Sequence, residues 1–114
     1  MKSNVSPPIT VACLCADWCG ACREYKPLFD SLARKFPDVR FLWVDVEDEA
    51  DLIDPIEVED FPTILIAAGD KPLFFGTVLP HIEQLARLIQ EKSAAVVKPM
   101  PHDAALVRLA AKLI

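Results

Sequence analysis

The period of the hydrophobic pattern changes near position 19, and this change constrains the fold more than any other feature of the chain. Residues 9–15, ITVACLC, form a short, β-prone and mostly apolar run, which is typical of a buried strand. After Cys19, apolar residues recur at the spacing of one helix face: Tyr25, Leu28, Phe29, Leu32, Ala33 and Phe36. A buried strand that passes directly into an amphipathic helix indicates the start of an α/β fold.

The rest of the chain continues this alternation of strands and helices. The pattern predicts a strand at 39–46, a short helix around 48–54, strands at 63–67 and 73–78 joined as a hairpin, and a helix that begins near Pro80. The order β-α-β-α-β-β-α predicts an α/β domain with a central mixed sheet of about four strands, flanked by helices. We divide the chain into an N-terminal arm at 1–8, this domain at 9–92, and a C-terminal extension at 93–114 that we expect to pack on the domain.

Composition and charge exclude several classes of function. With 114 residues, of which 53% are hydrophobic, the chain is long enough for one packed domain. A net charge of −5 argues against nucleic acid as a partner. No apolar run is long enough to span a membrane, and the N-terminus is a poor secretory signal, so we expect a cytoplasmic protein without a membrane partner. Nine of the 17 acidic residues lie between Asp45 and Asp60, which we interpret as a solvated acidic loop and short helix.

The four cysteines are confined to positions 13–22, so they cannot join distant parts of the fold by disulfides. They indicate a local site instead. Three interpretations are open: a redox-active dithiol, a metal cage, or small core residues that happen to be cysteine.

Cys19 and Cys22 lie where the predicted strand passes into the helix, and this position suits a redox dithiol. The first thiol is placed at the helix N-terminus, where free backbone N–H groups and the helix dipole favour the negative thiolate that attacks disulfides. Cys22 follows one turn later, close enough for a disulfide with Cys19. We expect Gly20 to supply backbone freedom for the tight loop and Trp18 to cover one side of the site.

Together with Pro27 in the helix, three further motifs resemble the thioredoxin family: Trp18-Cys19-Gly20-Ala21-Cys22, Phe61-Pro62-Thr63 and Gly76. The resemblance covers about residues 9–92 and implies a thioredoxin-like fold. Thioredoxins have an extra strand and helix before the strand at 9–15, so we expect an N-terminally shortened version of the fold.

The resemblance implies a thiol–disulfide oxidoreductase that reduces or exchanges protein disulfides. Cys19 would be the nucleophile and Cys22 the resolving thiol, with no metal or bound cofactor and with a disulfide reductase as electron donor. Pro62 would be cis and would face the dithiol. The groove that binds the substrate would be formed by Trp18, Gly20, Ala21, Phe61, Pro62, Thr63 and Gly76. The alternative is a thioredoxin-fold chaperone or assembly adaptor that binds a partner protein with little turnover.

Two positions depart from the family pattern. Cys13 stands where thioredoxins carry a buried aspartate, and Trp43 stands where they usually carry a lysine. Because the aspartate is thought to help deprotonate the resolving thiol, we expect Cys22 to attack more slowly here, with Cys13 as a possible modulator of the site.

Cys13 and Cys15 alternate with Leu14, so both point to the same face of their strand. The simplest interpretation is that both are small buried hydrophobic residues. Two alternatives are that Cys13 lies beneath the dithiol and exchanges with Cys22, or that all four cysteines hold a metal or an iron–sulfur cluster.

Without a preceding strand, the strand at 41–46 would be an exposed apolar edge of the sheet. We expect residues 94–114 to fold back over this edge, with 95–97 as a strand and 103–113 as a helix, and the protein to be a monomer. Dimerisation through the edge is the alternative.

Overall fold

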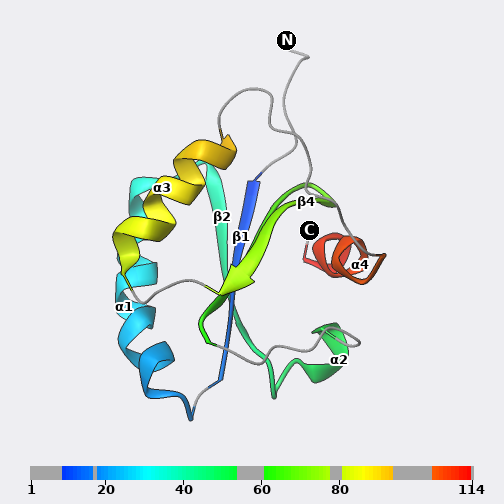
Figure 1. Cartoon of the computed structure of the whole chain (residues 1–114), viewed down its shortest axis with the longest axis horizontal. Helices are drawn as coiled ribbons and strands as arrows, with labels where there is room; N and C mark the ends of the chain where they lie inside the picture. Colours follow the sequence, from blue (N-terminus) through cyan, green and yellow to red (C-terminus); the bar gives the residue numbers. More distant parts are fainter. Residues whose placement is uncertain (1–8, 17, 54–60, 78–80, 94–103, 114) are drawn as a thin grey trace.

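The computed structural model describes residues 9–16, 18–53, 61–77, 81–93 and 104–113 (Figure 1). It contains, in order, β1 Ile9–Cys15, α1 Gly20–Lys35, β2 Val39–Asp45, α2 Ala50–Ile53, β3 Thr63–Ala68, β4 Lys71–Thr77, α3 Ile82–Ser93 and α4 Ala104–Lys112. The predicted α/β order is therefore confirmed. The N-terminal arm at 1–8 and the predicted strand at 95–97 lie outside the described residues.

The four described strands form one mixed sheet in the order β2-β1-β3-β4. β1 pairs in parallel with β2 and antiparallel with β3, which pairs antiparallel with β4. Central position explains the composition of β1, because a strand covered on both faces must be apolar throughout. Among the described strands β2 is an edge, as predicted. The turn between β3 and β4 includes Gly69, whose positive φ of 61° favours glycine.

Helices cover the two faces of the sheet, and β1 contributes to a separate core on each. In Figure 1, α1 and α3 lie together on one side of the strands, and α2 and α4 lie on the other. Val11, Cys13 and Cys15 belong to the first core, which contains residues of α1 and α3, whereas Ala12 and Leu14 belong to the second. This separation is the direct result of the alternation of side chains along a strand.

α1 turns one stripe of side chains toward the first core. Its buried residues are Cys22, Tyr25, Phe29 and Leu32, spaced at three or four residues. Leu28, which the apolar pattern assigns to the buried face, lies at the margin of this stripe and is 43% exposed. The stripe begins at a cysteine, so the first helical turn points a thiol at the sheet.

α4 belongs to the second core. Leu109 and Leu113 are buried in the cluster that contains Leu14 and Leu65, and the Lys112 ammonium donates a hydrogen bond to the Leu52 carbonyl at 3.4 Å. The helix predicted at 103–113 is present, but it lies against β4 and α2, over a face of the sheet. The expectation that this helix would cover the edge at β2 is therefore wrong.

No helix in the described part of the chain is both long enough and apolar enough to cross a membrane.

Candidate redox site

Cys19 is the residue that caps the N-terminus of α1, as the change of period predicts. Its backbone is extended, its N–H donates to the Ala16 carbonyl at 3.0 Å, and its own carbonyl accepts from the Arg23 N–H at 3.2 Å. The first turn of α1 carries no acidic residue that would compete for the positive end of the helix dipole. The Cys19 thiol is free and partly exposed. It is therefore placed to meet a partner from outside.

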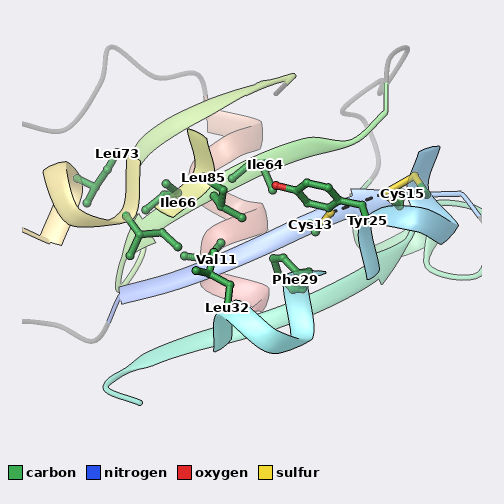
Figure 2. Packing of buried hydrophobic residues seen from close by; sticks show 12 residues of the cluster. Val11, Cys13, Cys15, Tyr25, Phe29, Leu32, Ile64, Ile66, Leu73 and Leu85 are labelled. Atoms are coloured by element: carbon green, nitrogen blue, oxygen red, sulfur yellow. Dashed lines mark hydrogen bonds between the residues drawn. A yellow bond between two sulfur atoms is a disulfide. The ribbon is translucent and has the colours of Figure 1, made fainter. Parts of the chain in front are cut away.

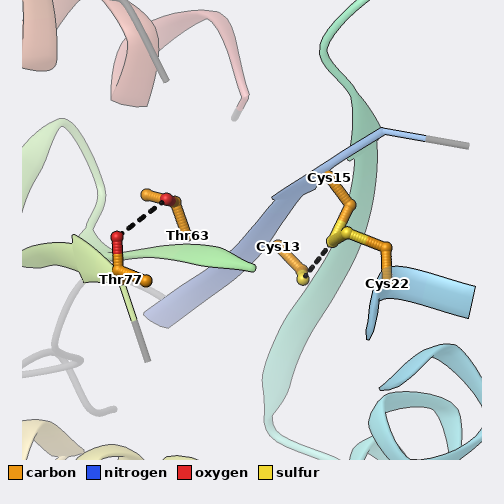
Figure 3. The surroundings of a disulfide bond; sticks show 5 residues. All are labelled: Cys13, Cys15, Cys22, Thr63 and Thr77. Carbon is orange, nitrogen blue, oxygen red and sulfur yellow. Dashed lines mark hydrogen bonds between the residues drawn. A yellow bond between two sulfur atoms is a disulfide. The ribbon is translucent and has the colours of Figure 1, made fainter. Parts of the chain in front are cut away.

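Cys22 points into the protein and forms a disulfide with Cys15 (Figure 3). The two Cα atoms are 5.8 Å apart, within the usual range for a disulfide. Cys22 heads the buried stripe of α1, and Cys15 is the last residue of β1 on the face that α1 covers. The strand and the helix therefore bring these two sulfurs together just where one element passes into the other.

This pairing corrects two expectations. Cys15 is buried, but it is not merely a small hydrophobic residue, because it is bonded to Cys22. The predicted Cys19–Cys22 disulfide is not present, since one sulfur can hold only one disulfide bond and Cys19 is a free thiol. The sequence does carry a signal for this pairing. Val11, Cys13 and Cys15 alternate along the strand and so share one face, and Cys22 is in register with the buried face of the helix that packs on it.

Cys13 is a second free thiol, and it lies next to this disulfide. It is fully buried, and its Sγ is 3.6 Å from the Cys15 Sγ (Figures 2 and 3). Because Cys15 has no thiol hydrogen in the disulfide, Cys13 is the donor in this contact. Burial raises the pKa of Cys13 to about 12, partly offset by the Lys26 charge, so Cys13 is protonated at neutral pH. The prediction that Cys13 and Cys15 share a face is confirmed; exchange between Cys13 and Cys22 stays a prediction.

The two positions that depart from the family pattern are neighbours in the sheet. Cys13 of β1 is aligned with Trp43 of β2. The Trp43 ring contacts Phe29 edge-on, with ring centroids 5.7 Å apart, and the Lys26 ammonium lies 5.1 Å from its centroid. Within the described residues the buried polar side chains are threonines and Tyr25, so no buried carboxylate lies behind the dithiol there.

Tyr25 places a buried hydroxyl beside these thiols. Figure 2 shows its ring next to Cys13, in the first core. The residue is 1% exposed, and its hydroxyl has no hydrogen-bond partner among the residues that the structure describes. Burial, and secondarily the nearby Cys13, raises the pKa of the Tyr25 hydroxyl. The surroundings of Cys13 and the disulfide are therefore apolar and hold one unsatisfied polar atom.

The rim of the site is formed from two distant parts of the chain. The Trp18 and Phe61 rings meet edge to face, with centroids 5.6 Å apart, although Trp18 is 64% exposed. The Phe61–Pro62 peptide bond is cis, which confirms that part of the prediction for Pro62; that Pro62 faces the dithiol stays a prediction. Thr63 opens β3 and is aligned with Thr77 of β4, with the hydroxyl oxygens 3.5 Å apart.

The small residues of the predicted groove have different structural settings. Gly20 begins α1 without a positive φ, and a Cβ added there would meet no atom within 4 Å, so the expected need for backbone freedom at Gly20 is wrong. Ala21 follows it in the same helix and is partly buried. Gly76 is aligned with Ile64 in the hairpin, and an added Cβ would make an ordinary contact with the Phe74 ring at 3.4 Å.

Two other expectations concern the acidic segment and a metal. Asp45 accepts hydrogen bonds at Oδ1 from the N–H groups of Glu47 and Asp48, at 2.9 and 3.0 Å, and so shapes the turn before α2. Residues 54–60 lie outside the described chain. The four-cysteine metal cage is not supported, because the Cys15–Cys22 disulfide uses two of the thiolates that it needs. No group of three potential ligands is assembled for a metal in the described ranges.

Curated relatives match the central part of the chain. A thioredoxin from Ophiophagus hannah is 39% identical over 61 residues, which are 54% of this chain and 58% of the relative. Thioredoxin H2-1 from Oryza sativa subsp. japonica is 39% identical over 82 residues, which are 70% of this chain and 59% of the relative. The chain thus spans less than two thirds of the length of these relatives.

Solved structures and a family model agree with these relatives. The thioredoxin of Fasciola hepatica superposes with a TM-score of 0.69 at 26% identity, over 75% of this chain and 81% of that one. A mutant thioredoxin from Halobacterium salinarum gives the same TM-score and identity, over 79% of each chain. The thioredoxin family model matches residues 3–91. The chain therefore belongs to the thioredoxin family.

Proposed function

We propose that the protein is a thiol–disulfide oxidoreductase that reduces or exchanges disulfides of other proteins through Cys19 and Cys22. The observation that carries the proposal is the setting of Cys19: a free, partly exposed thiol at the N-terminus of α1, with Cys22 one turn behind it. An aromatic pair and a cis-proline from the start of β3 stand in the same part of the fold. Membership of the thioredoxin family supports the same chemistry.

The reaction needs two exchange steps. The Cys19 thiolate attacks one sulfur of the substrate disulfide, forms a mixed disulfide with it, and releases the other substrate sulfur as a thiolate. Cys22, in its reduced form, then attacks the Cys19 sulfur, which frees the second substrate thiol and leaves Cys19–Cys22 oxidised. A disulfide reductase returns both thiols to the reduced form, and no bound cofactor takes part.

The rim residues suit an extended protein substrate. Trp18 and Phe61 present aromatic surface next to Cys19, and the space around Gly20 is open at the start of α1, where Ala21 would also line the groove. Pro62 and Thr63 would pair their backbone with the substrate chain, and Gly76 would line the far side. Because apolar rings recognise shape and area, this rim favours disulfides with apolar neighbours over small hydrophilic ones.

The setting of the reaction is also part of the proposal. We place the protein in the cytoplasm, where thiols are kept reduced and disulfides are mostly transient and catalytic, as proposed for this site. We propose that it acts as a monomer, with association through the β2 edge as the alternative. Analytical ultracentrifugation at several protein concentrations distinguishes the two. If the protein dimerises, its average molar mass should rise with concentration, whereas that of a monomer should stay constant.

Reduction of insulin by dithiothreitol tests the proposed reaction. The fully reduced wild type should accelerate insulin precipitation, and Cys19→Ser should abolish the acceleration because it removes the attacking sulfur. Ser31→Ala, an exposed change on the same helix, is the matched control and should behave as wild type. Full activity of Cys19→Ser would refute the assignment of the nucleophile.

One observation favours the adaptor as a second candidate function. The Cys15–Cys22 disulfide withdraws the resolving thiol, so in this state Cys19 can bind a partner sulfur but cannot complete a turnover. If reduced wild type, with its thiols verified by titration, does not accelerate insulin reduction, the binding function is the better description.

A further inference from the structure

Cys22 stands between two possible sulfur partners. Cys19 precedes it by one helical turn on the exposed side, at the cap of α1, and Cys15 meets it from β1 on the buried side. The structure holds the second of these two arrangements, with Cys19 as the free thiol. Because a sulfur has one disulfide partner at a time, the two arrangements exclude each other.

We propose that Cys15 is a third exchanging thiol of the site, which takes Cys22 from Cys19 and moves the disulfide from the surface into the core. This inference rests on the proposed function, because the Cys19–Cys22 disulfide is the product of that reaction. It adds a step that neither Cys19 nor Cys22 can perform alone.

The step is a thiol–disulfide exchange with no net oxidation. The Cys15 sulfur, as thiolate, attacks the Cys22 sulfur of the Cys19–Cys22 disulfide; the Cys15–Cys22 bond forms, the Cys19–Cys22 bond breaks, and Cys19 leaves as a thiolate. The proton that Cys15 gave up returns to Cys19 through solvent. The number of disulfides stays at one throughout, so no oxidant or reductant is needed.

The surroundings of Cys15 support its part in the exchange. Cys13, protonated at neutral pH, directs its S–H toward the Cys15 Sγ at 3.6 Å, and a thiolate at Cys15 would accept this hydrogen bond more strongly than a disulfide sulfur does. The Cys15–Cys22 disulfide is also almost fully buried, since both residues are 1% exposed. An apolar disulfide suits this core, whereas the departing Cys19 thiolate gains solvent and the helix N-terminus.

The consequence is an oxidised chain that still carries a surface nucleophile. In an oxidised dithiol site with only Cys19 and Cys22, both thiols are used in the disulfide, so the site cannot attack another disulfide until it is reduced. Here the transfer restores the Cys19 thiol, which can attack a disulfide of a second protein or glutathione disulfide, form a mixed disulfide and release the other sulfur as a thiolate. Since Cys22 is then bonded to Cys15, this second mixed disulfide is not resolved and should persist.

Disulfide mapping tests the transfer, because Asp17 separates the two halves of the cysteine cluster. Asp17 is the one aspartate in residues 1–23, so cleavage before it and after Arg23 places Cys13 and Cys15 in one peptide and Cys19 and Cys22 in another. The purified chain is oxidised to one disulfide with oxidised dithiothreitol, quenched in acid, unfolded, and alkylated with N-ethylmaleimide. A Cys15–Cys22 bond cross-links the two peptides; a Cys19–Cys22 bond stays within one.

The expected result for wild type is cross-linked peptides joined through Cys15, with Cys13 and Cys19 alkylated. Cys15→Ala should lose the cross-link and show the Cys19–Cys22 bond with no alkylated Cys19. Val11→Ala is the matched control, because it removes side-chain volume from the same buried face of β1, and it should give the wild-type map. A wild-type map with the Cys19–Cys22 bond and alkylated Cys15, or with a cross-link through Cys13, would overturn the proposal.

A second readout links the transfer to reactivity. Oxidised wild type treated with glutathione disulfide should retain glutathione on Cys19, whereas oxidised Cys15→Ala, in which Cys19 is bonded to Cys22, should acquire no adduct. Insulin reduction by Cys15→Ala separates the two proposals. If this variant is active but the wild-type map lacks the cross-link, the transfer fails and the oxidoreductase stands. If wild type and variant are both inactive while the cross-link is present, the proposed oxidoreductase fails.

Discussion

Replacing Tyr25 by phenylalanine should stabilise the protein. The Tyr25 hydroxyl is buried in the first core and has no hydrogen-bond partner in the described part of the chain. A buried polar group without a partner loses its hydration on folding and costs about 1–3 kcal/mol. The phenylalanine ring fills the same space apart from one oxygen, and the small void that remains reduces the gain. We therefore expect an increase of about 1 kcal/mol in the free energy of unfolding.

Thermal and chemical denaturation measure this change. For a domain of this size, 1 kcal/mol corresponds to a rise in Tm of roughly 3–6 °C. The urea midpoint should rise with an unchanged m-value, since the surface exposed on unfolding is nearly the same. Thr10→Val removes a hydroxyl from another buried position, in β1. Comparing the two variants shows whether the gain in stability is specific to Tyr25 or follows the loss of any buried hydroxyl.

The single tyrosine of the chain gives an independent check on the same environment. Because Tyr25 is the only tyrosine, its ionisation can be followed by tyrosinate absorbance without interference. Burial raises its pKa, so the phenol should stay protonated in the folded chain and ionise together with alkaline unfolding. A lowered Tm for Tyr25→Phe, or ionisation of Tyr25 at an ordinary pKa before unfolding, would mean that the hydroxyl is hydrogen-bonded or hydrated, and would contradict its burial without a partner.

Three further predictions concern the second core, the buried thiol and the rim. Leu109→Ala should lower stability by about 2–5 kcal/mol in urea denaturation, whereas the exposed change Arg108→Ala should stay within about 0.5 kcal/mol; equal effects would mean that α4 is not part of the core. The folded pKa of Cys13 is raised from 9.0 to about 12, so its protonated form stabilises the fold below pH 9, and this contribution is lost as the pH rises toward 12. Cys13→Ala should therefore reduce the fall of the unfolding free energy, measured in urea, between pH 9 and 12. If this fall is the same in wild type and variant, the thiol is not buried. Trp18→Ala should raise the KM for insulin several-fold without changing Tm. Leu28→Ala, which removes the other large exposed apolar side chain among the described residues, should leave KM unchanged; a matching rise in both variants would count against a binding role for Trp18.

The order of the elements could be predicted because each segment has one clear period. The strand at β1 and the stripe of α1 follow from spacing alone, and the cap at Cys19 follows from the point where one period replaces the other. The position of α4 could not be predicted in the same way. An amphipathic pattern shows that Leu109 and Leu113 face a core, but it does not show which surface of the sheet they cover.

Part of the site could be predicted from the sequence, but the partner of Cys22 could not. The motif around Cys19 and the cis Phe61–Pro62 bond follow from the family resemblance. The partner of Cys22 did not follow, because closeness along the chain favours Cys19, whereas the direction of a side chain on a helix favours Cys15. The closeness of Cys19 and Cys22 can be read directly from the sequence. The contact between Cys15 and Cys22 is known only once the helix and the strand are placed against each other.

Trapping the mixed disulfide identifies the sulfur that attacks a substrate, and so tests the proposed role of Cys19 directly. In a Cys22→Ser variant, the mixed disulfide formed with native, disulfide-bonded insulin has no Cys22 thiol to resolve it and should accumulate. After cleavage before Asp17 and after Arg23, we expect the insulin chain on the peptide that contains Cys19, with Cys13 and Cys15 alkylated only after unfolding. An adduct on the peptide with Cys13 and Cys15, or no adduct on folded protein with free Cys19, would contradict this role.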